Sequence, residues 1–153
     1  MPGPTDKPLV LDTHSWIWLL NGEESIGGSR FVAEAEAASV AGRLYICSIS
    51  ISEVALLASA GRVRLVVPVT TWLQEALETP GLQVIDIDIG IAAESAGLPG
   101  DFPGDTADRM IVAATRLIGG RLATADAALK QYGEAGYVSI LPLEDSPAGL
   151  APG

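Results

Sequence analysis

The sequence predicts an α/β fold in which helices cover both faces of a parallel sheet. Short apolar runs, typical of buried strands, alternate along the chain with longer stretches of helical length that end at glycine. Hydrophobic residues make up 48% of the 153 residues and charged residues 18%, which is typical of one well-buried domain. Because strands and helices alternate, right-handed crossovers place the strands side by side in parallel.

The first half of the chain begins with the apolar run PLVL, which the apolar stretch HSWIWLLNG follows directly. Gly22, Gly42 and Gly61 each stand at the end of a helical stretch, where glycine is common. The next apolar run, LYICSI, contains the single cysteine, Cys47, which we expect to be a small buried residue. The expected elements are strands at 8–11 and 44–49 and helices at 14–22, 29–43 and 50–62.

In the second half, proline and glycine again separate the predicted elements. Pro68 limits an extended segment, Pro80 and Gly81 close a helix, and the pair Gly119 and Gly120 ends a long helix. The expected elements are an extended segment at 63–68, strands at 82–87, 121–125 and 137–143, and helices at 70–81, 88–98, 105–120 and 126–133.

Composition and motifs exclude several classes of protein. We expect one domain at 8–143 between tails at 1–7 and 144–153. No apolar run reaches the roughly 18 residues of a membrane span, and the first residues lack the pattern of a signal peptide, so we expect a cytoplasmic protein without a membrane partner. The motifs of dinucleotide-binding, P-loop and α/β-hydrolase proteins are absent. The net charge of −10 disfavours a polyanionic partner unless acidic residues bind cations.

Acidic residues recur where predicted strands end and helices begin. Asp12 follows the first strand, Glu53 lies early in the helix after the second, and Asp126 follows the fourth. Asp105 and Asp108 open the helix that leads into the fourth strand. The carboxyl ends of parallel strands meet at one edge of a sheet, so these acids converge there. Aspartate is also a good N-cap, and DTAD resembles a capping box, so a structural role is the alternative for each.

The convergence of acids predicts a divalent metal site. Carboxylates that crowd together raise one another's pKa values unless a cation neutralises them. Ligands that are all oxygen suit Mg²⁺ or Mn²⁺, whereas one histidine and one cysteine disfavour zinc. Such ions activate water and stabilise the leaving oxygen in phosphodiester cleavage. The histidine, His14, has two interpretations, as a side chain packed near the first helix or as a general base.

Three segments carry a family resemblance: LVLDTHSWIWLLNG, SISEVALLASAGRV and GDTADRMIVAATRLIGGRLATADAAL. By their order and spacing, the chain resembles the VapC-like branch of the PIN-domain toxin ribonucleases from about Pro8 to about Leu143. The resemblance implies a three-layer α/β/α sandwich with a central parallel sheet. It also implies a metal-dependent endoribonuclease that a small antitoxin restrains, and a homodimer.

The resemblance further implies which acids are catalytic and bind the metal. Carried over by position, they are Asp12, Glu53, Asp108 and Asp126. Asp105 is either a cap or a further metal ligand. Two positions depart from the common pattern, since Ser52 stands where relatives often have tryptophan and Thr106 where they often have proline. A basic residue that often precedes this helix is missing too, which weakens the expected binding of substrate.

An acidic protein needs a way to approach RNA. Bound cations would cancel the local negative charge, and arginines near predicted helix ends would touch phosphate. The candidates are Arg62, Arg64, Arg109 and Arg116. Each is alternatively a surface charge or a salt-bridge partner. So few basic residues favour a structured RNA recognised by shape. The run from Trp16 to Leu20 is either buried on all sides or contacts another subunit or the antitoxin.

Two other functions are compatible with the same fold. One is a non-catalytic PIN-fold binding module, which predicts no metal-dependent activity. The other is a metal-dependent phosphatase or phospho-acceptor domain, since both use acids at strand ends with Mg²⁺. The phosphatase spacing D-x-D is absent, because Asp12 is followed by Thr13 and His14.

Overall fold

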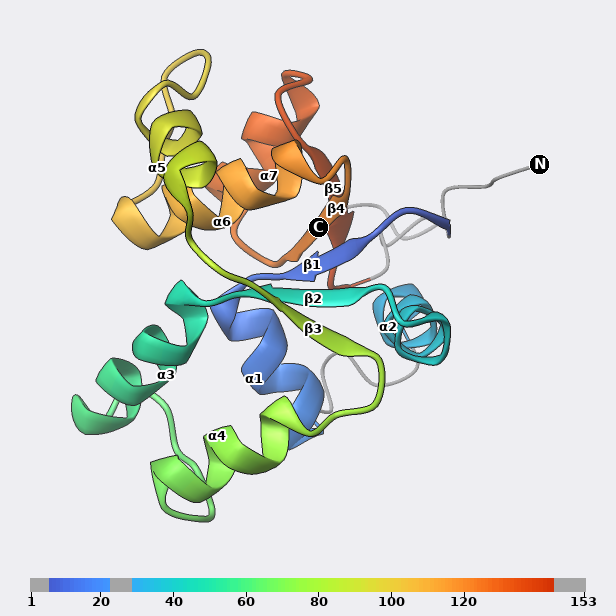
Figure 1. Ribbon diagram of the computed structural model, residues 1–153, viewed down its shortest axis with the longest axis vertical. Helices are drawn as coiled ribbons and strands as arrows, with labels where there is room; N and C mark the ends of the chain where they lie inside the picture. Colours follow the sequence, from blue (N-terminus) through green and yellow to red (C-terminus); the bar gives the residue numbers. More distant parts are fainter. Residues whose placement is uncertain (1–5, 23–28, 145–153) are drawn as a thin grey trace, which may run out of the picture.

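The computed structural model describes residues 6–22 and 29–144, which form three layers (Figure 1). Within these residues, five parallel strands form one sheet of order β3-β2-β1-β4-β5. The strands are β1 (Leu9–Leu11), β2 (Leu44–Cys47), β3 (Leu82–Ile85), β4 (Arg121–Thr124) and β5 (Ser139–Pro142). The central strand β1 pairs with both β2 and β4, so the chain order reverses there. The predicted α/β fold with a parallel sheet is confirmed.

Helices cover both faces of the sheet, as predicted. Helices α1 to α4 pack on one face, and α5 to α7 pack on the other (Figure 1). They are α1 (Thr13–Asn21), α2 (Arg30–Ala41), α3 (Ile49–Ser59), α4 (Val69–Leu77), α5 (Ile89–Ala96), α6 (Thr106–Leu117) and α7 (Ala127–Glu134). Alternate residues of a strand point to opposite faces. Leu9 and Leu11 of β1 therefore belong to the apolar core beneath α1 to α4, and Val10 belongs to the core beneath α5 to α7.

The helix ends follow the local sequence closely. Side chains of five N-cap residues accept a hydrogen bond from the first turn of their helix: Asp12, Ser29, Asp88, Asp105 and Asp126. Gly22 and Gly42 adopt the left-handed conformation after α1 and α2, with φ of 69° and 73°. That conformation favours glycine, which explains why these two helices end where the sequence predicted.

Two predicted segments differ in the structure. The second strand ends at Cys47, because Ser48 already has the helical backbone angles φ −57° and ψ −24°, and α3 begins at Ile49. The extended segment at 63–68 forms bends and joins no strand of the sheet. Cys47 is buried and free, as expected. None of the described helices is both long and apolar enough to cross a membrane.

The apolar run of helix α1 is buried at its start and partly exposed at its end. Trp16 and Ile17 are almost fully buried, and the Trp16 ring packs edge-on against Trp72 of α4 with ring centroids 5.2 Å apart. Trp18 is only half-buried, and Leu20 is 36% exposed. The first turns of α1 thus serve the core, while its last turn leaves apolar surface uncovered.

An ion pair anchors α2 to the amino end of β4. Arg121 Nη2 lies 2.7 Å from Glu34 Oε1, and both residues are buried. Arg30, one turn before Glu34, donates its Nε hydrogen to Glu34 Oε2 at 2.6 Å. Both oxygens of a buried carboxylate therefore lie close to guanidinium groups, whose opposite charge offsets part of the cost of burial, while Glu34 Oε1 and Arg121 Nε and Nη2 make no hydrogen bond of regular geometry.

Candidate active site at the carboxyl edge of the sheet

The topology brings the predicted acids to one edge of the sheet. Asp12 directly follows β1, Glu53 lies on the helix after β2, and Asp126 follows β4. Helix α6 leads into the amino end of β4 and runs antiparallel to it, so its first turn, with Asp105 and Asp108, lies at the same edge as the end of β4. In Figure 1 this edge is on the left, where the strand arrows point.

Asp12 is held between the two central strands. Its backbone N–H donates to Ala123 O of β4 at 3.2 Å. Its Oδ1 accepts hydrogen bonds from the N–H of Ser15 at 2.8 Å and from the hydroxyl of Ser15 at 2.5 Å. Asp12 is only 7% exposed, and this burial raises its pKa, although hydrogen bonds from the Ser15 and Thr124 hydroxyls oppose the shift. The carboxylate is therefore fixed in position and poorly neutralised.

Glu53 is linked to the segment that follows Asp12. The hydroxyl of Thr13 donates to Glu53 Oε1 at 2.5 Å, and Thr13 Oγ1 lies 2.9 Å from Ser50 Oγ. Glu53 is half-buried, whereas Thr13 and Ser50 are almost completely buried. Helices α1 and α3 thus meet through hydroxyl groups beside the acidic edge.

Asp105 and Asp108 form a capping box at the start of α6. Asp108 N–H donates to Asp105 Oδ1 at 2.9 Å, and Asp105 N–H donates to Asp108 Oδ2 at 3.3 Å. The pKa of Asp108 is raised to about 7, first by burial, then by the negative charge of Asp105 and further by that of Glu53. Asp105 is the N-cap of α6, and Asp108, which completes the capping box, is also affected by the negative charge of Glu53.

Asp126 caps α7 from a more exposed position. Its Oδ1 accepts from Leu129 N–H at 3.0 Å, and its own N–H donates to Thr124 Oγ1 at 3.0 Å. Because the Thr124 hydroxyl also hydrogen-bonds to the Asp12 carboxylate, it lies between the first and the fourth predicted acids. The structure thus connects Asp12 to Asp126 on one side and, through Thr13, to Glu53 on the other.

The acidic edge suits a hard cation by its chemistry. All the candidate ligands are carboxylates, and two of them, Asp12 and Asp108, have raised pKa values, so a cation would relieve unfavourable charge. In residues 6–22 and 29–144, no three acidic, histidine or cysteine side chains stand close enough to form a ready-made metal site. Asp105 and Asp108 contact each other directly, and the Thr124 hydroxyl lies between Asp12 and Asp126.

Comparisons with known proteins show the family to which the chain belongs. The family model of the PIN domain matches residues 9–135. This chain belongs to the PIN-domain family. It is 34% identical to "Ribonuclease VapC22" of Mycobacterium tuberculosis (strain ATCC 25618 / H37Rv) over 81% of this chain and 91% of that protein, so it is a VapC-like PIN domain.

Solved structures with the same fold include VapBC complexes. The DNA-bound VapBC of Salmonella typhimurium matches with a TM-score of 0.60 and 20% identity, over 90% of this chain and 98% of that chain. VapBC2 of Rickettsia felis, bound to a promoter DNA fragment, matches with a TM-score of 0.60 and 12% identity, over 88% of this chain and 97% of that chain. At these identities the likeness shows the fold alone.

Within this PIN domain, the predicted RNA-binding arginines fall into two groups. Arg109 donates to Ser95 O at 3.2 Å and its guanidinium lies 5.2 Å from the centre of the Phe102 ring. Arg116 forms an ion pair with Glu94 at 2.8 Å and donates to the Tyr137 carbonyl. Both are engaged in holding the α5–α6 layer together. Arg62 and Arg64 are exposed and follow α3, the helix of Glu53, so they remain the better candidates for phosphate contacts.

His14 lies near the start of α1, close enough to Asp12 that its charge acts to lower the pKa of that carboxyl. It is exposed, and its ring lies edge-on to Trp18 with centroids 6.0 Å apart. This contact favours the packing interpretation over a general base. Sequence reasoning missed four hydroxyl residues that support the acids: Thr13, Ser15, Ser50 and Thr124. The sequence could have indicated them, because each lies within three residues of a predicted acid.

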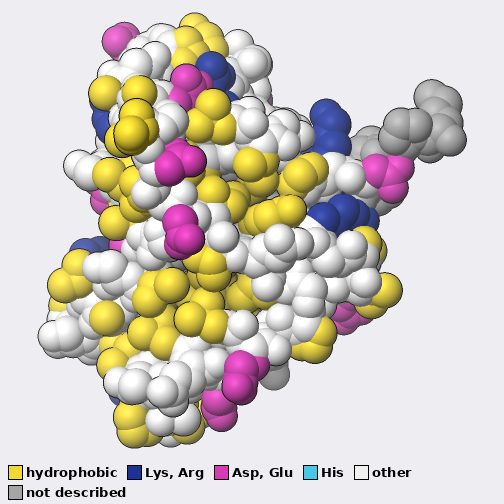
Figure 2. Space-filling model, in the orientation of Figure 1, with side chains coloured by type: hydrophobic (Ala, Val, Ile, Leu, Met, Phe, Trp, Pro, Cys, Tyr) yellow, Lys and Arg dark blue, Asp and Glu magenta, His cyan; other side chains and the backbone are white. Residues whose placement is uncertain are grey.

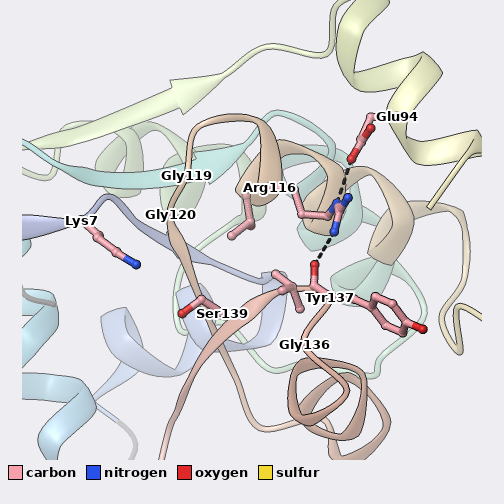
Figure 3. Close-up of a pocket in the computed structure, with 10 residues that line it drawn as sticks. Lys7, Glu94, Arg116, Gly119, Gly120, Gly136, Tyr137 and Ser139 are labelled. Carbon is pink, nitrogen blue, oxygen red and sulfur yellow. Dashed lines mark hydrogen bonds and ion pairs between the residues drawn. The ribbon is translucent and has the colours of Figure 1, made fainter. Parts of the chain in front are cut away.

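Several hollows of the surface lie away from the acidic edge. One of about 600 Å³ is at the opposite, amino edge of the sheet, where Lys7, Gly120 and Ser139 line it (Figure 3). Arg116, which also lines the hollow, is turned to Glu94 and to the Tyr137 carbonyl (Figure 3), so the positive charge of Arg116 is compensated. This hollow has neither the acids nor the position expected of the catalytic site.

Two apolar hollows adjoin each other on the α1–α4 side. One of about 510 Å³ is lined by Leu20, Val67, Trp72 and Ala76, among others, and one of about 390 Å³ by Leu19, Leu20, Val40 and Leu44, among others. They share Leu20 and Thr79, so they form one continuous groove. Figure 2 shows apolar side chains gathered on the face around β3 and the neighbouring helices, with acidic side chains scattered among them.

Proposed function

We propose that this PIN domain is a metal-dependent endoribonuclease and the toxin of a toxin–antitoxin pair. The observation that carries the proposal is the convergence of Asp12, Glu53, Asp108 and Asp126 on one edge of the sheet, where burial and the neighbouring carboxylates also raise the pKa of Asp108 to about 7. Perturbed pKa values of this kind cluster at functional sites, and Asp108 combines one with its place in the capping box of α6. The similarity to a protein named as a ribonuclease supports the same conclusion.

Four acids would hold Mg²⁺ or Mn²⁺ in this proposal: Asp12, Glu53, Asp108 and Asp126. The bound cation supplies charge stabilisation at the phosphodiester and lowers the pKa of a water nucleophile. Asp12 is the rigid anchor, because strand β4 and the first turn of α1 fix it from two sides. Asp105 keeps its role as the cap that orients Asp108. Asp126, the most exposed of the four, completes the ligand set from α7.

The substrate is proposed to be structured RNA. With a net charge of −10, the protein attracts RNA weakly at long range, so its specificity has to come from shape at a few contacts. Arg62 and Arg64 follow the end of α3 and are exposed, so they are candidates for phosphate contacts at a distance from the acids. An RNA substrate and an antitoxin partner place the proposed activity in the cytoplasm.

The antitoxin is proposed to occupy the continuous apolar groove around Leu20. The groove takes apolar surface from the end of α1, from α2 and from α4, which is the surface that the core leaves uncovered. The solved neighbours include toxin–antitoxin complexes, which supports a partner of this kind. Leu20→Glu should abolish co-purification with a co-expressed antitoxin while leaving RNA cleavage unchanged.

A homodimer is proposed through the apolar stretch that leaves β3. Val84, Ile87 and Ile89 are exposed along it, with Ile89 at 88%, and Leu117 of α6 lies next to the start of α5. Sedimentation or light scattering would show a dimer that Ile89→Lys converts to a monomer. A monomeric wild type at micromolar concentration would contradict this part.

The catalytic proposal is tested by cleavage of structured RNAs in Mg²⁺ or Mn²⁺. Asp12→Asn and Asp126→Asn should abolish cutting, because each removes a proposed metal ligand but keeps a side chain that caps its helix. Asp88→Asn is the matched control, since Asp88 is an exposed N-cap of α5 with no link to the other acids. Equal cutting by wild type and both site variants would refute the assigned site.

The non-catalytic binding module is a second candidate. The observation in its favour is that the acids in the described part of the chain stand in pairs and form no ready-made cluster of three. It predicts no Mn²⁺ binding and no new RNA ends when the protein is expressed in cells. Mapping RNA ends after induction of wild type and of Asp12→Asn therefore separates the two functions.

A further inference from the structure

Two buried hydroxyl groups connect the first helix to Glu53. Thr13 Oγ1 lies 2.5 Å from Glu53 Oε1 and 2.9 Å from Ser50 Oγ. Thr13 begins α1, while Ser50 and Glu53 are three residues apart on α3 and so share one face of that helix. Thr13 is 3% exposed and Ser50 is 0% exposed. The contact is thus a hydroxyl pair sealed between two helices, with one carboxylate at its end.

The number of hydrogens fixes the direction of these bonds. A hydroxyl carries one hydrogen, and a carboxylate in the ionised form that binds a cation only accepts. The hydrogen of Thr13 therefore goes to Glu53 Oε1, so Thr13 Oγ1 has to accept the hydrogen of Ser50. The relay runs from Ser50 to Thr13 to Glu53, and a donor that itself accepts a hydrogen bond donates more strongly.

Glu53 needs such a relay more than the other acids do. Asp12, Asp105 and Asp126 are N-caps, so backbone N–H groups of their own helices hold them. Asp108 is held by the other half of the capping box. Glu53 lies inside α3, beyond the first residues of the helix, and its longer side chain receives no backbone hydrogen bond among the described contacts. Its carboxylate is oriented by Thr13.

We infer that Thr13 and Ser50 are positioning residues, which hold the Glu53 carboxylate by Oε1 in an orientation that would let it bind a cation. This inference rests on the proposed metal-dependent function. It assigns two roles to one short segment, because Asp12 supplies a ligand directly and Thr13, the next residue, orients a second ligand from another helix. Hydrogen-bond partners of metal-binding carboxylates typically change metal affinity or activity by about 10- to 100-fold when they are removed.

The decisive variants change the hydroxyl and keep the volume. Thr13→Val removes the hydroxyl at nearly constant size, and Thr13→Ser keeps the hydroxyl. Thr115→Val is the matched control, since Thr115 is also fully buried but donates only within its own helix, to Ile111 O at 2.8 Å. Ser50→Ala is matched by Ser95→Ala, whose hydroxyl likewise donates within one helix, to Ala92 O.

Binding of Mn²⁺ to the purified protein, followed by the signal of free Mn²⁺ in electron paramagnetic resonance, is the main measurement. We expect Thr13→Val to weaken Mn²⁺ affinity about 10-fold or more. Its kcat for RNA should fall by a similar factor at fixed Mn²⁺, with KM for RNA unchanged. Ser50→Ala should have a smaller effect in the same direction, because Thr13 still donates. Thr13→Ser and both controls should resemble wild type.

A double-mutant cycle in chelator tests the hydrogen bond without any metal. Urea unfolding of wild type, Thr13→Val, Glu53→Ala and the double variant should be non-additive if the two side chains interact. Additive effects would overturn the relay itself. If Thr13→Val binds Mn²⁺ as tightly as wild type, or if Thr13→Ser loses as much affinity as Thr13→Val, the positioning role is wrong.

The same experiments distinguish failure of the function from failure of the inference. A wild type that neither binds Mn²⁺ nor cuts RNA would refute the proposed function, and the positioning role would be refuted with it, while the cycle still reports on the bond. A wild type that does both, beside an unimpaired Thr13→Val, would refute the positioning role alone.

Discussion

Two carboxylates at opposite edges of one sheet, Glu34 and Asp108, are treated very differently by the fold. Burial acts to raise the pKa of Glu34, but Arg121 and Arg30 outweigh it and the pKa is lowered. Asp108 takes part in none of the ion pairs found among the described residues, and burial together with the charges of Asp105 and Glu53 raises its pKa to about 7. The amino edge thus pairs its charge for stability. The carboxyl edge leaves charge unpaired, as expected where a cationic ligand is to bind.

The largest expected effect comes from breaking the paired edge. Glu34→Gln leaves the Arg121 guanidinium buried without its counter-charge, which should lower the free energy of unfolding by about 3–5 kcal/mol. Urea denaturation measures it, with Glu36→Gln on the exposed side of α2 as the control. A loss below about 1 kcal/mol would show that this pair behaves like a surface salt bridge.

Breaking the unpaired edge should cost activity and spare stability. Asp12→Asn removes the proposed anchor ligand, so kcat/KM for RNA should fall at least about 100-fold. Asparagine is as good an N-cap as aspartate and removes a poorly neutralised buried charge, so the free energy of unfolding in chelator should not decrease. An RNA cleavage assay tests the loss of activity, and urea denaturation tests the unchanged stability. A variant that is inactive because it unfolds would contradict the proposed difference between the two edges of the sheet.

The free energy of unfolding should depend on pH because the negative charge of Asp108 is not paired with a positive one among the described residues. Its native pKa of about 7 lies above the ordinary value of 3.8, so between about pH 4 and pH 7 the native state binds more protons than the unfolded state. Stability therefore falls as pH rises through this window. Solvent screening of the half-buried group limits the effect to about 1–2 kcal/mol.

Asp108→Asn should flatten this profile in chelator and stabilise the protein at pH 8 by a comparable amount. Urea midpoints at pH 5 and pH 8 provide the measurement. Saturating Mn²⁺ should restore the stability of wild type at pH 8, because a ligand that binds only the native state stabilises it. An Asp108→Asn profile identical to that of wild type would show that another group is responsible.

The smallest expected effect concerns Arg62, one of the exposed arginines that follow α3. Arg62→Gln should raise KM for RNA by about 2- to 5-fold at low salt and less at high salt, because a single phosphate contact is screened by counterions. Lys130→Gln on α7 is a control for the loss of one positive charge. An equal effect of both variants would indicate general electrostatic attraction in place of a specific contact.

Much of the fold was predictable because its signals are local. Buried strands appear as short apolar runs, glycines in the left-handed conformation follow α1 and α2, and aspartates cap α1, α6 and α7. The exact end of β2 was missed, because Ser48 and Ile49 continue an apolar run while their backbone already turns into α3. Propensity does not distinguish the last residue of a strand from the first of a helix when both are buried.

The candidate site was predicted in part for the same reason. Parallel strands bring residues after their carboxyl ends together, so the common location of the four acids follows from topology. Their partners do not follow from it. Nothing in the sequence pairs Thr13 with Glu53 across 40 positions, or Arg121 with Glu34, because such contacts depend on how helices pack on the sheet.

The sequence by itself thus determined the alternation of elements, the helix caps, the family and the edge at which the acids gather. Tertiary structure alone decided which acid is neutralised and which stays unpaired, which arginines are engaged, and which part of α1 is left apolar and exposed. The physical reason is the separation in sequence over which each kind of interaction acts. Caps and periodicity act within one or two turns of chain, whereas desolvation and charge pairing depend on neighbours that only the packed layers bring together.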